Sequence, residues 1–221
     1  MNGRTAVTMR TGHGLSIREV AVVRQLAGLN LGYPDAELLT RLPLMRMAVA
    51  TLRASVGGPL AGLIDHLART PPEQLATDYV ATFDLSRRHA LHLTYFTHGD
   101  TRKRGLALLR IKQTYRRFGF VIDDSELPDH LGVVLEFAAT VDADAGTRLL
   151  LEYRAGLELL GLALAEARSP YAAATAAVSA TLPPLHGSAR EAIVRLAAEG
   201  PPGEEVGLDP FVPPEVSGAR R

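Results

Sequence analysis

The chain has 221 residues, enough for one domain or two small ones. Apolar residues make up 47% and charged residues 22%, which is typical of a folded globular protein, and the formal net charge is zero, so no overall field draws the chain to nucleic acid or to anionic lipid. Cysteine is absent, which excludes disulfides, thiolate metal sites and a thiol nucleophile.

The N-terminal stretch MNGRTAVTMRTGHG is polar and lacks the apolar core of a signal peptide. Nowhere do about 18 uncharged apolar residues follow one another, as a membrane-spanning helix requires. We therefore expect a cytoplasmic protein without membrane insertion, with residues 1–15 as a flexible N-terminus.

The first helices are marked by caps and breakers. Ser16-Ile-Arg-Glu19 is a capping box, and the helix that it opens should end near Gly32 because Pro34 disfavours helical backbone at the residue before it. Asp35 is placed to cap the next helix. A further helix is expected from about Leu44, interrupted by Gly57-Gly58-Pro59.

Apolar residues at helical spacing continue along the chain to Leu164, and Ser169-Pro170 restarts it. Thr70-Pro-Pro should end one helix and start the next, Gly119 should close another, and Pro128 should stand near the start of the one after it. A long helix is expected over residues 144–168, and Ser188-Ala-Arg-Glu191 is a second capping box. The apolar positions that define these helices are Leu60, Leu63, Ile64, Leu67, Leu75, Tyr79, Val80, Phe83, Leu108, Ile111, Tyr115, Phe118, Leu131, Val134, Leu135, Ala138, Leu149, Tyr153, Leu157, Leu160 and Leu164.

The predicted fold class is all-α, a single-domain helical bundle of eight to ten helices. The only strand-like alternation, residues 91–96, is too short to build a sheet. We expect the helical domain over residues 16–199 and a loose, proline- and glycine-rich tail over residues 200–221.

Charges are separated along the chain. Residues 87–117 hold nine cations and one acid, Asp100, whereas residues 118–145 hold seven acids and no cation. The basic helix could grip an anion, with Asp100 as its cap and Arg102 pointing at the ligand. We favour a structural role, in which Asp100 caps the helix and the cations face solvent or pair with the acids that follow. No nucleic-acid recognition motif accompanies the charge, so no nucleic-acid partner is expected.

Signals for catalysis are weak. His89, His92 and His98 with Asp100 could form a metal site, but the glutamate of the zinc-hydrolase helix is missing, and partly buried histidines bonded to backbone carbonyls are the favoured alternative. Glu126, Asp129 and His130 could act as an acid–base set only in a dry cleft. There is no nucleophile elbow, phosphate-binding loop or dinucleotide fingerprint. We expect no enzymatic activity, no cofactor and no bound metal.

The stretch from residue 79 to residue 139 contains LTY, GDTRKRG, ELPDHL and LEFAA in this order, and LGYPD and VGLDPF flank it. In combination these elements resemble the NarJ-type assembly chaperones of respiratory nitrate reductase, within the wider group of redox-enzyme maturation chaperones. The resemblance spans residues 16–211.

The resemblance implies an all-helical protein that binds the N-terminal segment of the apo catalytic subunit of nitrate reductase. Such a chaperone assists insertion of the molybdenum cofactor and delays membrane docking, and molybdenum-cofactor biosynthesis proteins are further candidate partners. The alternatives are a chaperone for another molybdoenzyme and, further off, a metal-dependent enzyme that uses histidines and carboxylates.

The client peptide is expected to lay an apolar face in a groove between helices while its basic residues face the acidic segment. The resemblance places client binding at the ELPDH region. The residues expected to contact the client are Glu126, Asp129 and His130, then Asp123 and Asp124, with Tyr95, Asp100 and Arg102 as second choices.

Overall fold

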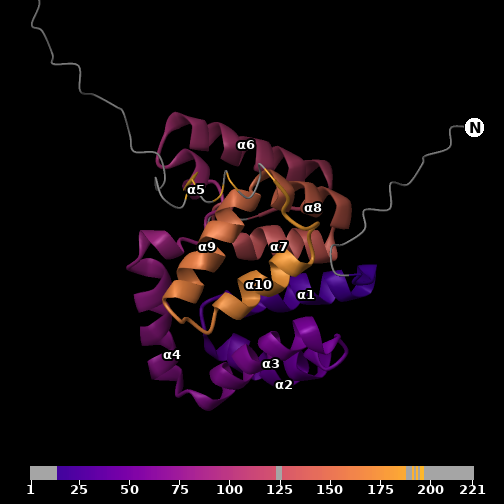
Figure 1. Ribbon diagram of the computed structural model, residues 1–221, viewed down its shortest axis with the longest axis vertical. Helices are drawn as coiled ribbons and strands as arrows, with labels where there is room; N and C mark the ends of the chain where they lie inside the picture. Colours follow the sequence, from indigo (N-terminus) through magenta and orange to yellow (C-terminus); the bar gives the residue numbers. More distant parts are fainter. Residues whose placement is uncertain (1–13, 123–125, 188–190, 192, 194, 197–221) are drawn as a thin grey trace, which may run out of the picture.

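The computed structural model describes residues 14–122 and 126–187, together with 191, 193, 195 and 196. Ten α-helices and two short helical turns account for most of these residues (Figure 1). The helices are α1 (Ile17–Asn30), α2 (Ala36–Val49), α3 (Ala54–Arg69), α4 (Pro72–Tyr79), the π-helical η1 (Val80–Asp84), the 3-10 turn η2 (Arg87–His89), α5 (Tyr95–His98), α6 (Arg102–Arg117), α7 (Leu131–Thr140), α8 (Ala143–Glu152), α9 (Arg154–Glu166) and α10 (Ala172–Ala180). The described residues hold no strand, so the predicted all-α class is confirmed.

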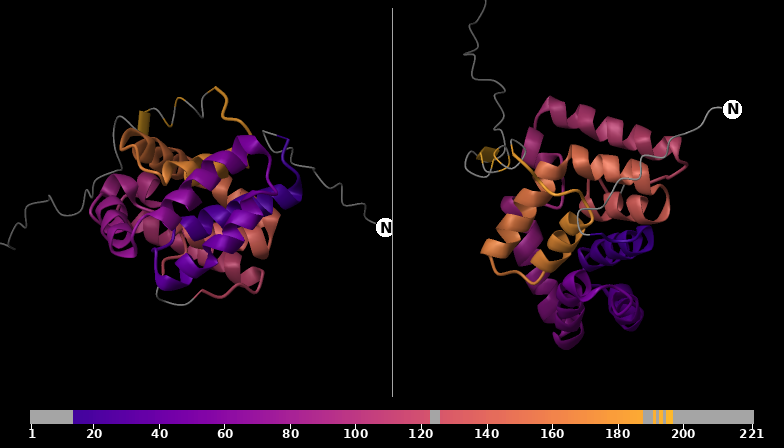
Figure 2. Two further views of the ribbon diagram at one scale, coloured as in Figure 1. Left: turned by 90° about the horizontal axis from the view of Figure 1, so that it is seen from below. Right: turned by 45° about the vertical axis from the view of Figure 1, so that its right-hand side comes forward.

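Helix α1 is the centre of the packing, with α7 and α10 against it and the α2–α3 pair beyond. Its predicted capping box is present, because Ser16 Oγ accepts from the Glu19 amide while the Glu19 carboxylate accepts from the Ser16 amide. Gly28 allows the close approach of α7, since a Cβ there would lie 3.3 Å from Leu135 Cβ. The α2–α3 pair forms one end of the molecule and α6 forms the opposite end (Figure 2).

Several predicted boundaries are confirmed. The Asp35 carboxylate accepts from the Leu38 amide at the start of α2, and Pro72 is the first residue of α4. Gly119 follows α6 with a φ of +72°, the left-handed backbone that favours glycine.

Two predicted breaks are wrong. Helix α2 runs through Pro43, and α3 starts at Ala54 and runs through Gly57-Gly58-Pro59. The break lies at residues 50–53 instead. A proline inside a helix removes one hydrogen bond, and the packing of α2 against α3 maintains both helices despite that loss.

The predicted long helix over residues 144–168 is also wrong. The chain bends at Tyr153, which ends α8 and precedes α9. The bend directs the two apolar faces to different partners, α8 to α7 and α9 to α10 and α5.

Among the described residues no helix is both long and apolar enough to cross a bilayer. The second predicted capping box, at residues 188–191, lies largely outside the described residues, as do most of residues 1–15 and all of the predicted tail.

Candidate functional site

Two segments far apart in the sequence meet beside α6. The Leu93 amide donates to the Asp129 carbonyl at 3.1 Å, and the Leu131 amide donates to the Leu91 carbonyl at 2.7 Å. Between these bonds His92 and His130 form an isolated antiparallel bridge, with ring centroids 5.5 Å apart. The short alternating stretch 91–96 therefore pairs with the ELPDHL segment and fixes its position.

Asp129 is at the centre of this junction and its side chain is fully buried. One carboxylate oxygen, Oδ2, accepts from the Thr94 amide at 3.1 Å and from the Thr94 hydroxyl at 2.5 Å, while Arg104 Nη2 stands 3.8 Å away. The other oxygen, Oδ1, lies 3.4 Å from His92 Nδ1 without an aligned hydrogen bond. We call Asp129, His92, Thr94 and Arg104 the Asp129 cluster.

The cluster keeps Asp129 ionised. Burial by itself would raise the pKa of this carboxyl group, but the contacts with His92 and Thr94 and the charge of Arg104 outweigh it, so the pKa lies below its usual value. Burial lowers the pKa of the neighbouring His130, although the Glu126 carboxylate, 3.9 Å from His130 Nε2, acts in the opposite direction. Near neutral pH the Asp129 carboxylate is therefore charged, while the neighbouring His130 imidazole is mostly neutral.

The structure brings the main predicted site residues together but exposes them unequally. Glu126 is exposed, His130 is mostly covered, and Asp129 has no exposed surface. Glu126 is thus accessible from solvent, whereas Asp129 makes contacts only within the protein. Asp123 and Asp124 lie outside the described residues.

The prediction that Asp100 caps α6 is wrong. The cap position is Thr101, which makes no side-chain capping bond, and the Asp100 carboxylate instead accepts from Arg104 Nη1 at 3.0 Å, one turn into the helix. Arg104 also lies over the Tyr95 ring, 5.9 Å from its centroid. Arg104, which sequence reasoning did not select, therefore joins Asp100, Tyr95 and Asp129, while Arg102 is exposed and outside this set.

The histidines do not gather around a common point. His89 contacts the Thr82 carbonyl through Nδ1 and the Ala163 carbonyl through Nε2, which confirms the bonding to backbone carbonyls expected of it. His92 faces Asp129 instead. In the part of the chain that the structure describes, no three histidine, aspartate or glutamate side chains lie close enough together to hold a metal ion.

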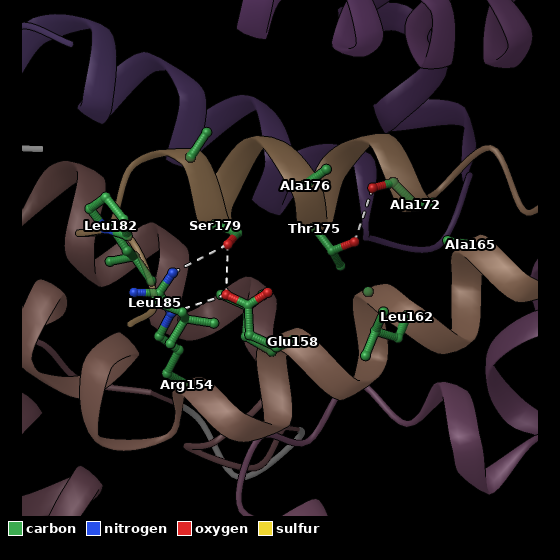
Figure 3. A pocket seen from close by; sticks show the side chains of 14 residues that line it. Arg154, Glu158, Leu162, Ala165, Ala172, Thr175, Ala176, Ser179, Leu182 and Leu185 are labelled. Carbon is green, nitrogen blue, oxygen red and sulfur yellow. Dashed lines mark hydrogen bonds and ion pairs between the residues drawn. The ribbon is translucent and has the colours of Figure 1, made fainter. Parts of the chain in front are cut away.

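A groove of about 500 Å³ lies between α9 and α10 (Figure 3). Small residues on both helices create it, chiefly Gly161, Ala165, Ala172 and Ala176, and the half-exposed Leu162 stands at its rim. The two helices are antiparallel neighbours because Arg168, with a φ of +53°, ends α9 in a tight turn closed by the Ser169 amide on the Leu164 carbonyl at 2.9 Å.

One end of the groove is polar. Glu158 accepts from Arg154 Nε at 3.0 Å and from Ser179 Oγ at 2.6 Å (Figure 3). The opposite side of α9 packs against Leu93, which stands between His92 and Thr94 of the Asp129 cluster. A Cβ on Gly156 would lie 2.4 Å from the Leu93 carbonyl oxygen. The groove and the junction therefore share α9 as a common wall.

Sequence reasoning did not identify this groove. The available signal is the run AAATAAVSA of α10, in which one face carries only alanine, threonine and serine. A face of small residues forms the wall of a groove only when a second helix packs beside it at a suitable distance. The sequence does not specify that distance.

Comparisons with known proteins agree with the resemblance seen in the motifs. The family described as nitrate reductase delta subunit matches residues 50–177, from just before α3 into α10. The nitrate reductase-like protein NarX of Mycobacterium tuberculosis is 46% identical over 164 residues, which are 72% of this chain and 24% of NarX. This chain thus spans about a quarter of that relative.

A relative of similar length is the probable nitrate reductase molybdenum cofactor assembly chaperone NarJ of Bacillus subtilis, 34% identical over 143 residues that cover 64% of this chain and 78% of NarJ. Among solved structures, a putative redox enzyme maturation protein from Archaeoglobus fulgidus matches with a TM-score of 0.54 and 25% identity, over 72% of this chain and 91% of that one. The family match covers more than half of the chain and includes the Asp129 cluster and most of the groove, and we conclude that the chain belongs to the nitrate reductase delta subunit family.

Proposed function

We propose that this protein is a system-specific chaperone that binds the N-terminal segment of the apo catalytic subunit of respiratory nitrate reductase. It acts in the cytoplasm, assists insertion of the molybdenum cofactor before membrane docking, and catalyses no reaction itself. The observation that carries the proposal is the match with the family and with most of the length of the assembly chaperone NarJ. A chaperone for another molybdoenzyme is the alternative.

The groove between α9 and α10 is the proposed seat for the apolar face of the client. Its volume of about 500 Å³ lies within the range of roughly 300–1,000 Å³ found for binding pockets. Amphipathic helices commonly bind in apolar grooves between helices, and small side chains on both walls let such a segment approach the backbone closely.

The ELPDHL segment, which lies across α9 from the groove, is the proposed second, polar contact for the client. Exposed Glu126 offers a charge to a basic client residue, and His130 lies beside it. Asp123 and Asp124 would extend the acidic surface. Tyr95, Asp100 and Asp129 act indirectly through Arg104, and Arg102 remains a candidate contact at the start of α6.

Calorimetric titration with a peptide from the reductase N-terminus tests the proposal. Because ordering the peptide offsets much of the free energy of burial, we expect a dissociation constant near micromolar, about 8 kcal/mol of binding free energy. A peptide that fails to bind at hundreds of micromolar contradicts the proposal.

Paired variants locate the site. Ala176→Phe fills the groove from an exposed position and should weaken binding about tenfold or more, whereas Ala68→Phe on the exposed face of α3 should not. Glu126→Lys should weaken binding more than Glu136→Lys, which makes the same charge change on α7. Equal effects of both members of a pair would show that the peptide binds elsewhere.

A further inference from the structure

The outer face of α6 has an unusual composition. Nine of its residues are exposed, namely Arg102, Lys103, Gly105, Leu106, Leu109, Arg110, Gln113, Arg116 and Arg117. Five of these are cations, two are leucines and none is an acid. Since the whole chain has a formal net charge of zero, this face concentrates positive charge locally.

Cations lie on both sides of the two leucines. At 100° per residue, Leu106 and Leu109 are 60° apart around the axis, near the middle of the exposed face, with Arg110 and Lys103 on one side and Arg116 on the other. They are 57% and 49% exposed, while Ala107, Ile111 and Tyr115 on the opposite side hold α6 to the body. These leucines are therefore not needed for the core.

The cations of this face are available to a partner. Arg104, which points inward, uses its charge on Asp100 and Asp129. The other five cations all face solvent. Within the described residues, none of them forms an ion pair with another residue; they are Arg102, Lys103, Arg110, Arg116 and Arg117.

The position of α6 suits a flat partner. It forms the outer edge of the molecule at the end away from α2 and α3 (Figures 1 and 2). Its 16 residues extend over about 24 Å along the axis. Just beyond its end Phe118, whose ring packs against Phe137, and Val121 are 41% and 84% exposed.

From these observations we infer that α6 docks reversibly onto an anionic lipid surface, with Leu106 and Leu109 in the headgroup region and the five cations against lipid phosphates. Clusters of arginine and lysine on an exposed helix bind anionic leaflets, and each cation near the leaflet contributes roughly fivefold in affinity. Exposed leucines add apolar area that can enter the headgroup region. Nucleic acid would use the cations but would leave the leucines in water, and no exposed aromatic ring of α6 offers a stacking surface.

Flotation of the full chain with vesicles tests the inference. Vesicles with about 30% phosphatidylglycerol in phosphatidylcholine should carry the protein at 50 mM salt, with much less bound at 500 mM salt and little on pure phosphatidylcholine. Arg110→Glu/Arg117→Glu and, separately, Leu106→Ala/Leu109→Ala should each weaken binding tenfold or more. Arg18→Glu/Arg168→Glu, which makes the same change in net charge at exposed positions of other elements, should bind within about twofold of the unchanged protein.

Four outcomes overturn the inference. They are absence of flotation, equal binding to charged and neutral vesicles, an equal loss in the control variant, and a short DNA duplex that binds as tightly as the charged vesicles. Client-peptide titration is a separate readout. It should be unaffected in Arg110→Glu/Arg117→Glu, and a loss of peptide binding with vesicle binding retained would assign this face to the peptide instead.

Discussion

Asp129 shows how a residue in a recognisable motif can act without touching a partner. Its carboxylate is buried, bonded to Thr94 and close to His92 and Arg104, so it links the ELPDHL segment to residues 91–98 and to α6. A buried charge is stable only when its neighbours compensate for the lost hydration. The role that the structure supports for Asp129 is thus to position the exposed residues Glu126 and Leu127.

Asp129→Asn should lower the free energy of unfolding by about 3 kcal/mol, because Arg104 loses its buried counter-ion. Asp100→Asn removes the carboxylate that accepts from Arg104, but the Asp100 side chain is mostly exposed, so the change should stay within about 0.5 kcal/mol. Urea denaturation of both variants measures the difference. If Asp129→Asn is as mild as Asp100→Asn, the Asp129 cluster does not organise this part of the fold.

Helix ends were predicted well where the cap is local and poorly where packing decides. The Ser16 and Asp35 caps bond within three residues, so the sequence contains the whole interaction. By contrast, the bend at Tyr153 and the continuation of α2 through Pro43 depend on which helices lie alongside.

Glycines within helices provide a test of this packing. Gly156→Ala should cost about 2 kcal/mol or more, since its Cβ would lie 2.4 Å from the Leu93 carbonyl oxygen and α9 would have to move. Gly62→Ala on α3 has no atom within 4 Å of the new Cβ and should stabilise the protein by about 0.5–1 kcal/mol. Thermal and urea unfolding should therefore shift in opposite directions for the two variants. A harmless Gly156→Ala would show that α9 does not press on residues 91–98.

Across the whole molecule, charge is distributed by surface and by element. Seven of the nine cations of residues 87–117 show this: Arg104 pairs with Asp100 and Asp129, Arg88 pairs with Glu166 at 2.7 Å, and five on the outer face of α6 face solvent. We expected cations of the basic helix to pair with the acids that follow it. Arg104 does so with Asp129, whereas the cations of the outer face form no such pair within the described residues.

The pH dependence of unfolding sums such groups over the whole chain. The pKa of His130 is lowered by burial, so the unfolded state binds more protons below about pH 6.5 and stability falls as the pH drops from 7.5 to 5.5. Asp129 and Glu19 also have lowered pKa values, Glu19 to about 2 through its bonds with Arg53 and Ser16, and their contributions are lost only below about pH 4. Urea unfolding at several pH values should show a smaller decline between pH 7.5 and 5.5 for His130→Gln, and an unchanged decline would exclude His130 as its source.

The sequence by itself determined the class, the family and many of the helix starts, because helical periodicity, caps and motif order are local in the chain. It also drew attention to the ELPDHL segment, whose role in client binding stays a prediction, as do the limits of the helical domain at residues 16 and 199. Only the tertiary structure decided which side chains of that segment face solvent, that Arg104 rather than a cap bond uses Asp100, and that small residues of α9 and α10 enclose a groove. Burial and cavities depend on the distance between helices far apart in the sequence, and no local pattern contains that distance.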